Sequence, residues 1–204
     1  MKHKNEAAQT NKTRRRRNRA DEILEIATKL FGQYGFQGTT LAMVAEVVGL
    51  TEPGVLHYFP SKVHLLQGVL AYRDARDFEK YAALIALKKE NVAEFFAIME
   101  RFWGDNEKIP ALIQLFVVLV GESISGEHPS HHFFVDRYRR QREIFTQQFR
   151  QISVRPDVDL DELASVIIAV MDGLHIQWLL DPDAVNLTAT FSLFSKMIVP
   201  YLEG

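Results

Sequence analysis

Apolar residues recur along this chain at intervals of three and four, and this spacing restricts the possible folds more than any other feature of the sequence. In residues 19–34, for example, Ile23, Ala27, Leu30 and Tyr34 fall on one face of a helix. No stretch after Asn18 alternates with a period of two between hairpin turn residues. The sequence therefore predicts an all-α protein. After a first helix over 19–34, we expect two short helices over residues 39–49 and 51–59, a long one from Ser61, and others over 91–105, 109–124, 130–152, 159–181 and 186–202.

The first 20 residues are strongly basic, although the whole chain has a formal net charge of −2. They hold eight Lys or Arg against Glu6 alone, which gives +7 and leaves −9 for the rest. A basic end on an acidic body directs attraction for a polyanion to one part of the molecule. We expect residues 1–18 to form a disordered basic arm. The arginines expected to reach a DNA groove are Arg14, Arg15, Arg16, Arg17 and Arg19.

Residues 41–59 meet the physical requirements of a helix-turn-helix. Its two helices cross closely, so the first needs a small residue, the turn needs tolerance of positive φ, and the second needs a branched apolar anchor. Ala45, Gly49 and Val55 supply these in order. Thr39 or Thr40 can cap the first of the two helices, and Pro53 suits the first turn of the second. We expect a DNA-binding domain over residues 19–66 and a second domain over 67–204.

The same stretch resembles the tetracycline-repressor (TetR) family of transcription regulators. The residues that carry the resemblance are 23–35, Thr39-Thr40, Val44-Ala45, Gly49-Leu50-Thr51 and Leu56-His57-Tyr58-Phe59-Pro60-Ser61-Lys62. A looser resemblance covers residues 171–182. Membership of this family would imply that the third helix enters the major groove and that the second and fourth helices contact phosphates. It would also imply that the C-terminal domain binds an effector and dimerises.

Carried over position by position, the resemblance implies individual DNA contacts. The expected phosphate contacts are Thr40, Tyr58 and Lys62, and the expected groove-facing residues are Ala42, Thr51, Glu52, Pro53, Gly54 and His57. Lys62 would add a cation to a helix N-terminus that already favours anions. Leu56 stands where the family usually has a phosphate-contacting tyrosine, so this contact is lost or moved. Glu52 either accepts from a cytosine amino group or only complements the helix dipole.

Two apolar faces on the helix over residues 159–181 predict a dimer. One face carries small residues that allow another helix to approach closely. The opposite face carries bulky residues that suit the core of its own chain. With the last helix, the small face predicts an isologous four-helix interface, although packing within one chain would produce the same pattern. The expected interface residues are Ser165, Ala169, Gly173, Ile176, Leu180, Phe191, Phe194 and Ile198.

The middle helices are rich in aromatic residues, which suits an apolar effector pocket with few polar anchors. Any single one of these aromatic residues is more often part of a core than a ligand contact. The expected effector-binding residues are Phe95, Met99, Phe102, Trp103, Phe116, Glu122, Phe134, Tyr138, Met171, His175 and Trp178.

Other classes of function find little support. The chain has no cysteine, which excludes disulfides and thiolate sites, and the sequence Gly-Glu-Ser-Ile-Ser at 121–125 lacks the final glycine of a nucleophile elbow. A metal site at His128, His131, His132 and Glu122 matches no defined spacing, so we expect a solvated turn, no metal and no cofactor. A non-specific architectural DNA-binding protein remains an alternative, favoured by a third helix without Arg, Asn or Gln.

The sequence thus predicts a homodimeric, sequence-specific DNA-binding regulator and no enzyme. We expect a repressor that leaves a palindromic operator when a small, largely apolar effector binds. The apolar run at 109–120 is shorter than the roughly 20 residues of a membrane-spanning helix, and the basic N-terminus is no secretory signal. We therefore expect a cytoplasmic protein without a membrane partner.

Overall fold

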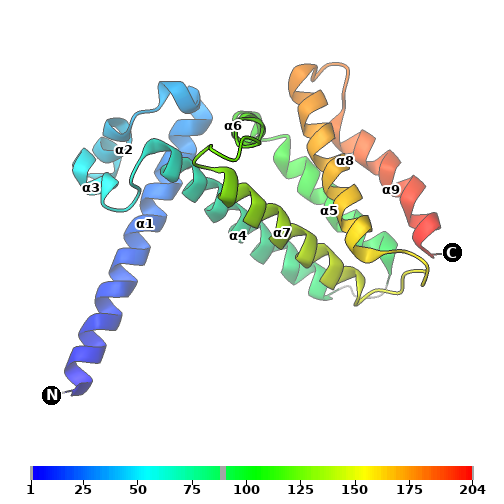
Figure 1. The fold of residues 1–204 in the computed structure, drawn as a ribbon, viewed down its shortest axis with the longest axis horizontal. Helices are drawn as coiled ribbons and strands as arrows, with labels where there is room; N and C mark the ends of the chain where they lie inside the picture. The colour runs from blue at the N-terminus through cyan, green and yellow to red at the C-terminus, as the bar shows by residue number, and fades with distance from the viewer. Residues whose placement is uncertain (1, 88–90, 204) are drawn as a thin grey trace. The chain divides into compact units, whose positions relative to one another are not determined.

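The structure, a computed structural model, describes the backbone of residues 2–87 and 91–203 and the side chains of residues 19–80 and 91–203. All regular elements in these ranges are helices, which confirms the predicted all-α fold (Figure 1). They are α1 (Lys2–Gly38), α2 (Leu41–Val48), α3 (Glu52–Leu56), α4 (Lys62–Leu87), α5 (Val92–Asn106), α6 (Pro110–Glu122), α7 (His131–Phe149), α8 (Leu160–Leu180) and α9 (Leu187–Glu203).

The chain divides into two compact units, Met1–Ala75 and Arg76–Gly204, and the division falls inside α4. We expected it earlier, after residue 66. The difference arises because the first turns of α4 belong to the first unit: a Cβ on Gly68 would lie 2.9 Å from Leu24 of α1, and Tyr72 donates a hydrogen bond to Glu25.

The backbone of α1 is already helical at Lys2, whereas we expected a disordered arm before a helix beginning near residue 19. The sequence explains the difference, since no proline interrupts this stretch and Ala, Lys, Arg, Gln and Glu, which favour helices, are common in it. The predicted DNA contacts of Arg14 to Arg17 concern side chains outside the described residues. At the other end, Gly35 breaks the regular helix with φ 70° and ψ 178°, as expected.

The helix-turn-helix is built by caps that the sequence specifies. Thr40 accepts a hydrogen bond from the Met43 N–H (3.1 Å), and Thr51 accepts one from the Gly54 N–H (3.2 Å). Between the two helices Gly49 adopts the left-handed conformation, with φ 70° and ψ 41°. Ala45 and Val55 are buried at the crossing, with 3% and 0% exposure. Each residue therefore has the structural role that its spacing predicted.

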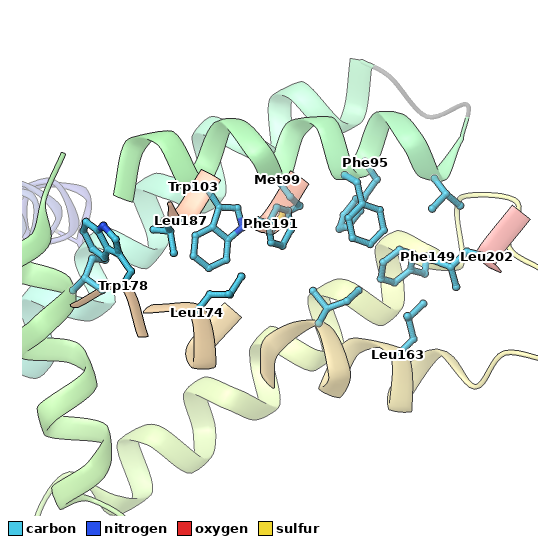
Figure 2. Packing of buried hydrophobic residues seen from close by; sticks show 14 residues of the cluster. Phe95, Met99, Trp103, Phe149, Leu163, Leu174, Trp178, Leu187, Phe191 and Leu202 are labelled. Atoms are coloured by element: carbon cyan, nitrogen blue, oxygen red, sulfur yellow. The ribbon is translucent and has the colours of Figure 1, made fainter. Parts of the chain in front are cut away.

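The second unit buries a core between paired helices. Helix α5 packs against α9, α7 packs against α8, and α8 also contacts α6 and α9. Figure 2 shows that Trp103, Met99 and Phe191 occupy the middle of this core, whereas Trp178 lies at one end and Phe149 at the other. Asn91, Asp159 and Asn186 accept hydrogen bonds from the first turns of α5, α8 and α9, respectively.

Among the described helices, α8 is by length and composition sufficiently apolar to cross a bilayer, with a mean hydropathy of 1.7 over its most apolar window. The apolar run that we considered, in α6, is shorter. A core helix passes the same test, and α8 buries Leu163, Ile167, Leu174 and Trp178 within its own unit. Packing within the unit therefore accounts for the apolar residues on one face of α8.

Two helical glycines test how tightly α4 packs in the first unit. An alanine Cβ at Gly68 would lie 2.8 Å from the Phe59 ring, whereas one at Gly32 would meet nothing within 4 Å. We expect Gly68→Ala to destabilise the first unit, because overpacking costs about 1–3 kcal/mol, and Gly32→Ala to stabilise it by about 0.5–1 kcal/mol through reduced chain entropy. Thermal unfolding of both variants measures this, and a Gly68→Ala variant as stable as Gly32→Ala would contradict the close packing.

Candidate DNA-binding and effector sites

Helix α3 and the start of α2 form an exposed surface on the first unit. Ala42 of α2 and Glu52, Pro53 and His57 around α3 are all exposed, as groove-facing residues must be. Val55, on the other face of α3, anchors the helix in the core. Gly54 is less available than predicted, because it is half-buried and a Cβ there would lie 3.3 Å from Thr51 Oγ1.

Leu56 and its neighbours lie at the end of α3. The Leu56 side chain is 37% exposed, so it does not serve as a core residue. The His57 and Tyr58 rings lie edge to face, 5.6 Å apart, and Tyr58 is half-buried. This end of α3 thus presents an apolar side chain and two aromatic rings where the resemblance implied phosphate contacts.

Two of the basic residues expected to contact DNA have other partners in this structure. Lys62 Nζ donates hydrogen bonds to the carbonyl oxygens of Phe36 (2.9 Å) and Thr39 (3.1 Å). Arg19 donates one to the Val48 carbonyl (2.9 Å) and forms an ion pair with Glu22 (2.6 Å). These carbonyls lie at the C-terminal ends of α1 and α2, where the helix dipole favours a cation. Lys62 and Arg19, both expected to contact DNA, thus also hold backbone carbonyls of the first unit.

In the second unit, one group of predicted effector residues surrounds Trp103. Its indole is fully buried and lies 4.6 Å from the His175 ring and 4.9 Å from the Phe191 ring, measured between centroids. Asn106 Nδ2 lies 3.2 Å from His175 Nε2. Asn106 was not among the expected residues, although it lies seven residues after Met99 on the buried face of α5. The Trp103 Nε1–H is buried and has no hydrogen-bond partner among the described residues.

A second group lies between α6, α7 and α8. Phe116 and Phe134 are 5.9 Å apart, and the guanidinium of Arg137 lies 4.4 Å above the Phe116 ring. Tyr138 Oη donates a 2.6 Å hydrogen bond to Asp172 Oδ2. Burial raises the pKa of the Asp172 carboxyl, against the opposing effects of this bond and of Arg137. Burial and the neighbouring Asp172 also raise the pKa of Tyr138.

Two predicted effector residues lie apart from these groups. Glu122 is exposed at the end of α6. Phe95 packs against Phe149 (4.8 Å between ring centroids) at the other end of α5, so it belongs to the core there. A surface hollow of about 680 Å³ lies elsewhere in the second unit. It is lined by charged residues of α7 and α8, with Ser165 and Val166, and none of the predicted aromatic residues lines it.

The predicted dimer residues of α8 and α9 differ in their exposure. Ser165, Ala169, Ile176 and Leu180 of α8 are exposed, as a partner-facing helix requires. Phe191 is fully buried in the core of its own chain, whereas Phe194 and Ile198 are half-buried and pack against that core. The exposed apolar residues of α9 are instead Leu193, Met197 and Tyr201. Both faces of α9 are apolar, and periodicity alone did not show which face is inward.

The histidines around the loop between α6 and α7 form hydrogen-bonding contacts within that loop. His128 Nδ1 accepts from the Ser130 N–H (3.1 Å) and lies 3.1 Å from Ser123 Oγ, whereas His131 Nδ1 lies 2.9 Å from the Ser123 carbonyl. Within the described residues, no group of three or more His, Cys, Asp or Glu is arranged to hold a metal ion.

Comparisons with known proteins agree with this architecture. Residues 23–69 match the family described as bacterial regulatory proteins, tetR family, and residues 97–198 match the family described as BetI-type transcriptional repressor, C-terminal. The two matches and the geometry of α2 and α3 define a helix-turn-helix DNA-binding regulator of transcription. The chain belongs to the TetR family. This is a family of transcription regulators, so the enzyme alternative is rejected.

Individual relatives are distant along most of the chain. The nucleoid occlusion factor SlmA of Idiomarina loihiensis is 23% identical over 163 residues, covering 78% of this chain and 82% of that protein. The regulator RutR of Escherichia coli is 38% identical over 78 residues, which cover 38% of this chain and 35% of that protein. A putative transcriptional regulator from Saccharomonospora viridis, solved in complex with choline, has a TM-score of 0.66 at 21% identity and covers 88% of this chain and 94% of its own.

Asp172 provides a test of the buried polar group in the second unit. Because burial raises its pKa above the ordinary value of 3.8, the folded chain binds this proton more tightly than the unfolded chain. The stability from this group is fully present below the unfolded pKa and is lost as the pH rises through the folded pKa. We therefore expect Asp172→Asn, which stays neutral and can still accept from Tyr138, to raise the melting temperature at pH 7.

Scanning calorimetry at several pH values measures this effect. The difference in melting temperature between Asp172→Asn and the unsubstituted chain is expected to shrink as the pH falls towards 4. The matched control is Asp136→Asn, which removes an exposed carboxylate paired with Arg139 on the surface of α7 and is expected to change stability by less than about 1 kcal/mol. A pH-independent difference at Asp172 would contradict the burial of its charge.

Proposed function

We propose that this regulator is a homodimeric repressor in the cytoplasm, which binds a palindromic operator and leaves it when a small, largely apolar effector binds to the second unit. The observation that carries the proposal is the pair of faces on α8. One face fills the core, and the other leaves Val166, Ile176 and Leu180 exposed, the last by 81%.

The exposed apolar residues of α8 and α9 support a dimer. Leu193, Met197 and Tyr201 recur every four residues on α9, and α9 contacts α8. Two helices with exposed apolar faces side by side match the requirement of an isologous four-helix interface, in which the same surface of two copies meets itself. A dimer also places two recognition helices on half-sites about 34 Å apart, which explains the expectation of a palindrome.

The buried groups around Trp103 and Phe116 support an effector site. An indole N–H without an acceptor is a feature that a bound molecule with one oxygen would satisfy, and the surrounding rings supply apolar contact. In the described structure these residues pack against one another. Effector binding therefore requires the helices of the second unit to separate, and this separation is the change that we propose to weaken DNA binding.

The energy required for such a switch is modest. Weakening operator binding a hundredfold needs a differential effector affinity of about 2.7 kcal/mol, because coupling between two sites is reciprocal. Burial of about 100 Å² more apolar surface in the released state supplies roughly 2.5 kcal/mol. A largely apolar effector is therefore sufficient.

A cationic effector is a second candidate, favoured by one specific observation. Asp172 is a mostly buried carboxyl beside Tyr138, with Phe134 and Phe116 on the neighbouring helices. A small quaternary ammonium ion binds well to aromatic rings and would offset the cost of a buried carboxylate. The Saccharomonospora viridis relative in complex with choline supports this candidate.

A matched pair of probes separates the two candidates. Choline and its neutral isostere 3,3-dimethyl-1-butanol have nearly the same shape, and calorimetric titration gives the affinity of each. The apolar proposal predicts that the neutral alcohol binds at least as tightly and weakens binding to an operator duplex selected from a random library. Choline binding that is at least tenfold tighter, and is lost in Asp172→Asn, would establish the cationic candidate instead.

Gly173 tests the dimer. A Cβ at Gly173 of α8 meets nothing within 4 Å inside the single chain, and the same holds at Gly121 of α6. We expect Gly173→Leu to keep its fold but to separate the paired helices, which converts the dimer into monomers, because a close helix approach does not tolerate a bulky residue. Gly121→Leu is the matched control and should stay dimeric. Light scattering gives the mass of each, and a dimeric Gly173→Leu variant would place the interface elsewhere.

A further inference from the structure

We propose that the effector of this regulator carries a carbonyl oxygen, as a ketone or an ester does, and that the indole N–H of Trp103 binds this oxygen. The inference rests on the proposed effector site in the second unit and adds the chemical class of the effector's polar group. Three buried polar side chains carry it, Trp103, Asn106 and His175, which we call the indole cluster.

The indole cluster lies where three helices of the second unit meet. Trp103 and Asn106 are three residues apart on the buried face of α5, and His175 belongs to α8. Their exposed fractions are 0%, 1% and 6%, respectively. From α9, the Phe191 ring lies 4.9 Å from the indole between centroids, and Figure 2 shows both rings in the middle of the core. A molecule bound at the cluster would therefore contact α5, α8 and α9.

The Trp103 Nε1–H is a buried donor that finds no acceptor in the part of the chain that the structure describes. An indole nitrogen only donates, and a buried indole N–H usually has a partner, because burial without one gives up the hydrogen bond that water provides in the unfolded chain. The neighbouring rings of Phe102 and Phe191 offer neither oxygen nor nitrogen. An oxygen atom of a bound molecule would supply the missing acceptor.

The imidazole beside the indole supplies a second donor. Asn106 Nδ2 faces His175 Nε2 at 3.2 Å, and an amide nitrogen only donates. Nε2 is therefore the accepting atom, and we assign the proton of the neutral ring to Nδ1. The rings of His175 and Trp103, 4.6 Å apart between centroids, then each carry an N–H donor. A carbonyl oxygen, which only accepts, fits this arrangement better than a hydroxyl, whose own hydrogen also needs an acceptor.

Matched probes test the hydrogen bond. Acetophenone and α-methylstyrene have nearly the same shape, but only acetophenone has a carbonyl oxygen. Calorimetric titration gives the ratio of their affinities for the unsubstituted protein and for Trp103→Phe, which keeps an aromatic ring and lacks the N–H. We expect the ratio of acetophenone to α-methylstyrene affinity to fall about tenfold in Trp103→Phe, because the lost hydrogen bond affects only the ketone. Comparing ratios between proteins cancels the different hydration of the two probes.

The matched control is Trp178→Phe, which changes the other tryptophan of the chain, at one end of the same core. We expect it to keep the ratio of the unsubstituted protein. A ratio that stays the same in Trp103→Phe would overturn the inference and leave the apolar effector site standing. If 1-phenylethanol, the corresponding alcohol, lost more affinity than acetophenone in Trp103→Phe, the carbonyl assignment would be wrong. If no probe binds the unsubstituted protein, the apolar effector site itself is rejected.

A second measurement does not require Trp103→Phe to fold. With ¹⁵N-labelled indoles, the two tryptophans give two Nε1–H signals in the magnetic resonance spectrum, and the Trp178→Phe control assigns them. A hydrogen bond moves the proton signal of its donor downfield, whereas the phenyl ring that both probes share affects the signal equally. We expect saturating acetophenone to move the Trp103 signal further downfield than α-methylstyrene does. Equal shifts with the two probes would refute a hydrogen bond to the carbonyl.

Discussion

The left-handed turn at Gly49 is the constraint on which the first unit depends. With φ 70° and ψ 41°, it lets α2 end and α3 begin within three residues, and the N–H groups of Gly49 and Leu50 bond back to the carbonyls of Glu46 and Ala45. The crossing of α2 and α3 then brings Ala45 close to α3 and leaves the other face of α3 exposed. A side chain larger than hydrogen at position 49 would strain this conformation, and the residues of α3 that are proposed to reach DNA would move with it.

The sequence sufficed for these elements because each depends on residues close together in the chain. Caps such as Thr40 and Thr51, the turn at Gly49 and the buried face of α2 follow from spacing, and the structure confirms them. The hydrogen bonds of Lys62 and Arg19 to backbone carbonyls did not follow, because these partners lie 23 to 29 positions away and no local pattern encodes them. The burial of Phe191 on α9 did not follow for a similar reason: both faces of this helix are apolar, and only the packing against α5 decides which face is inward.

The second unit combines a large aromatic core with a few buried polar groups. Tyr138, Asp172 and Arg137 lie together only because α7 packs against α8, and Asp172 and Arg137 were not among the expected site residues. Such groups are costly unless they are satisfied, so they limit how the helices can be rearranged. A pocket that opens only when helices separate lowers the apparent affinity of any ligand by the fraction of open molecules. The same requirement ties ligand binding to a change in helix packing.

The positions of the two tryptophans allow the two units to be distinguished by fluorescence. Trp103 and Trp178 are both buried in the second unit, whereas the described aromatic residues of the first unit are tyrosines and phenylalanines. Intrinsic tryptophan emission therefore reports on the second unit alone. An emission transition whose midpoint differs from that of the helical circular dichroism would show that the two units unfold in separate steps. The natural chain thus allows each unit to be followed without an attached dye.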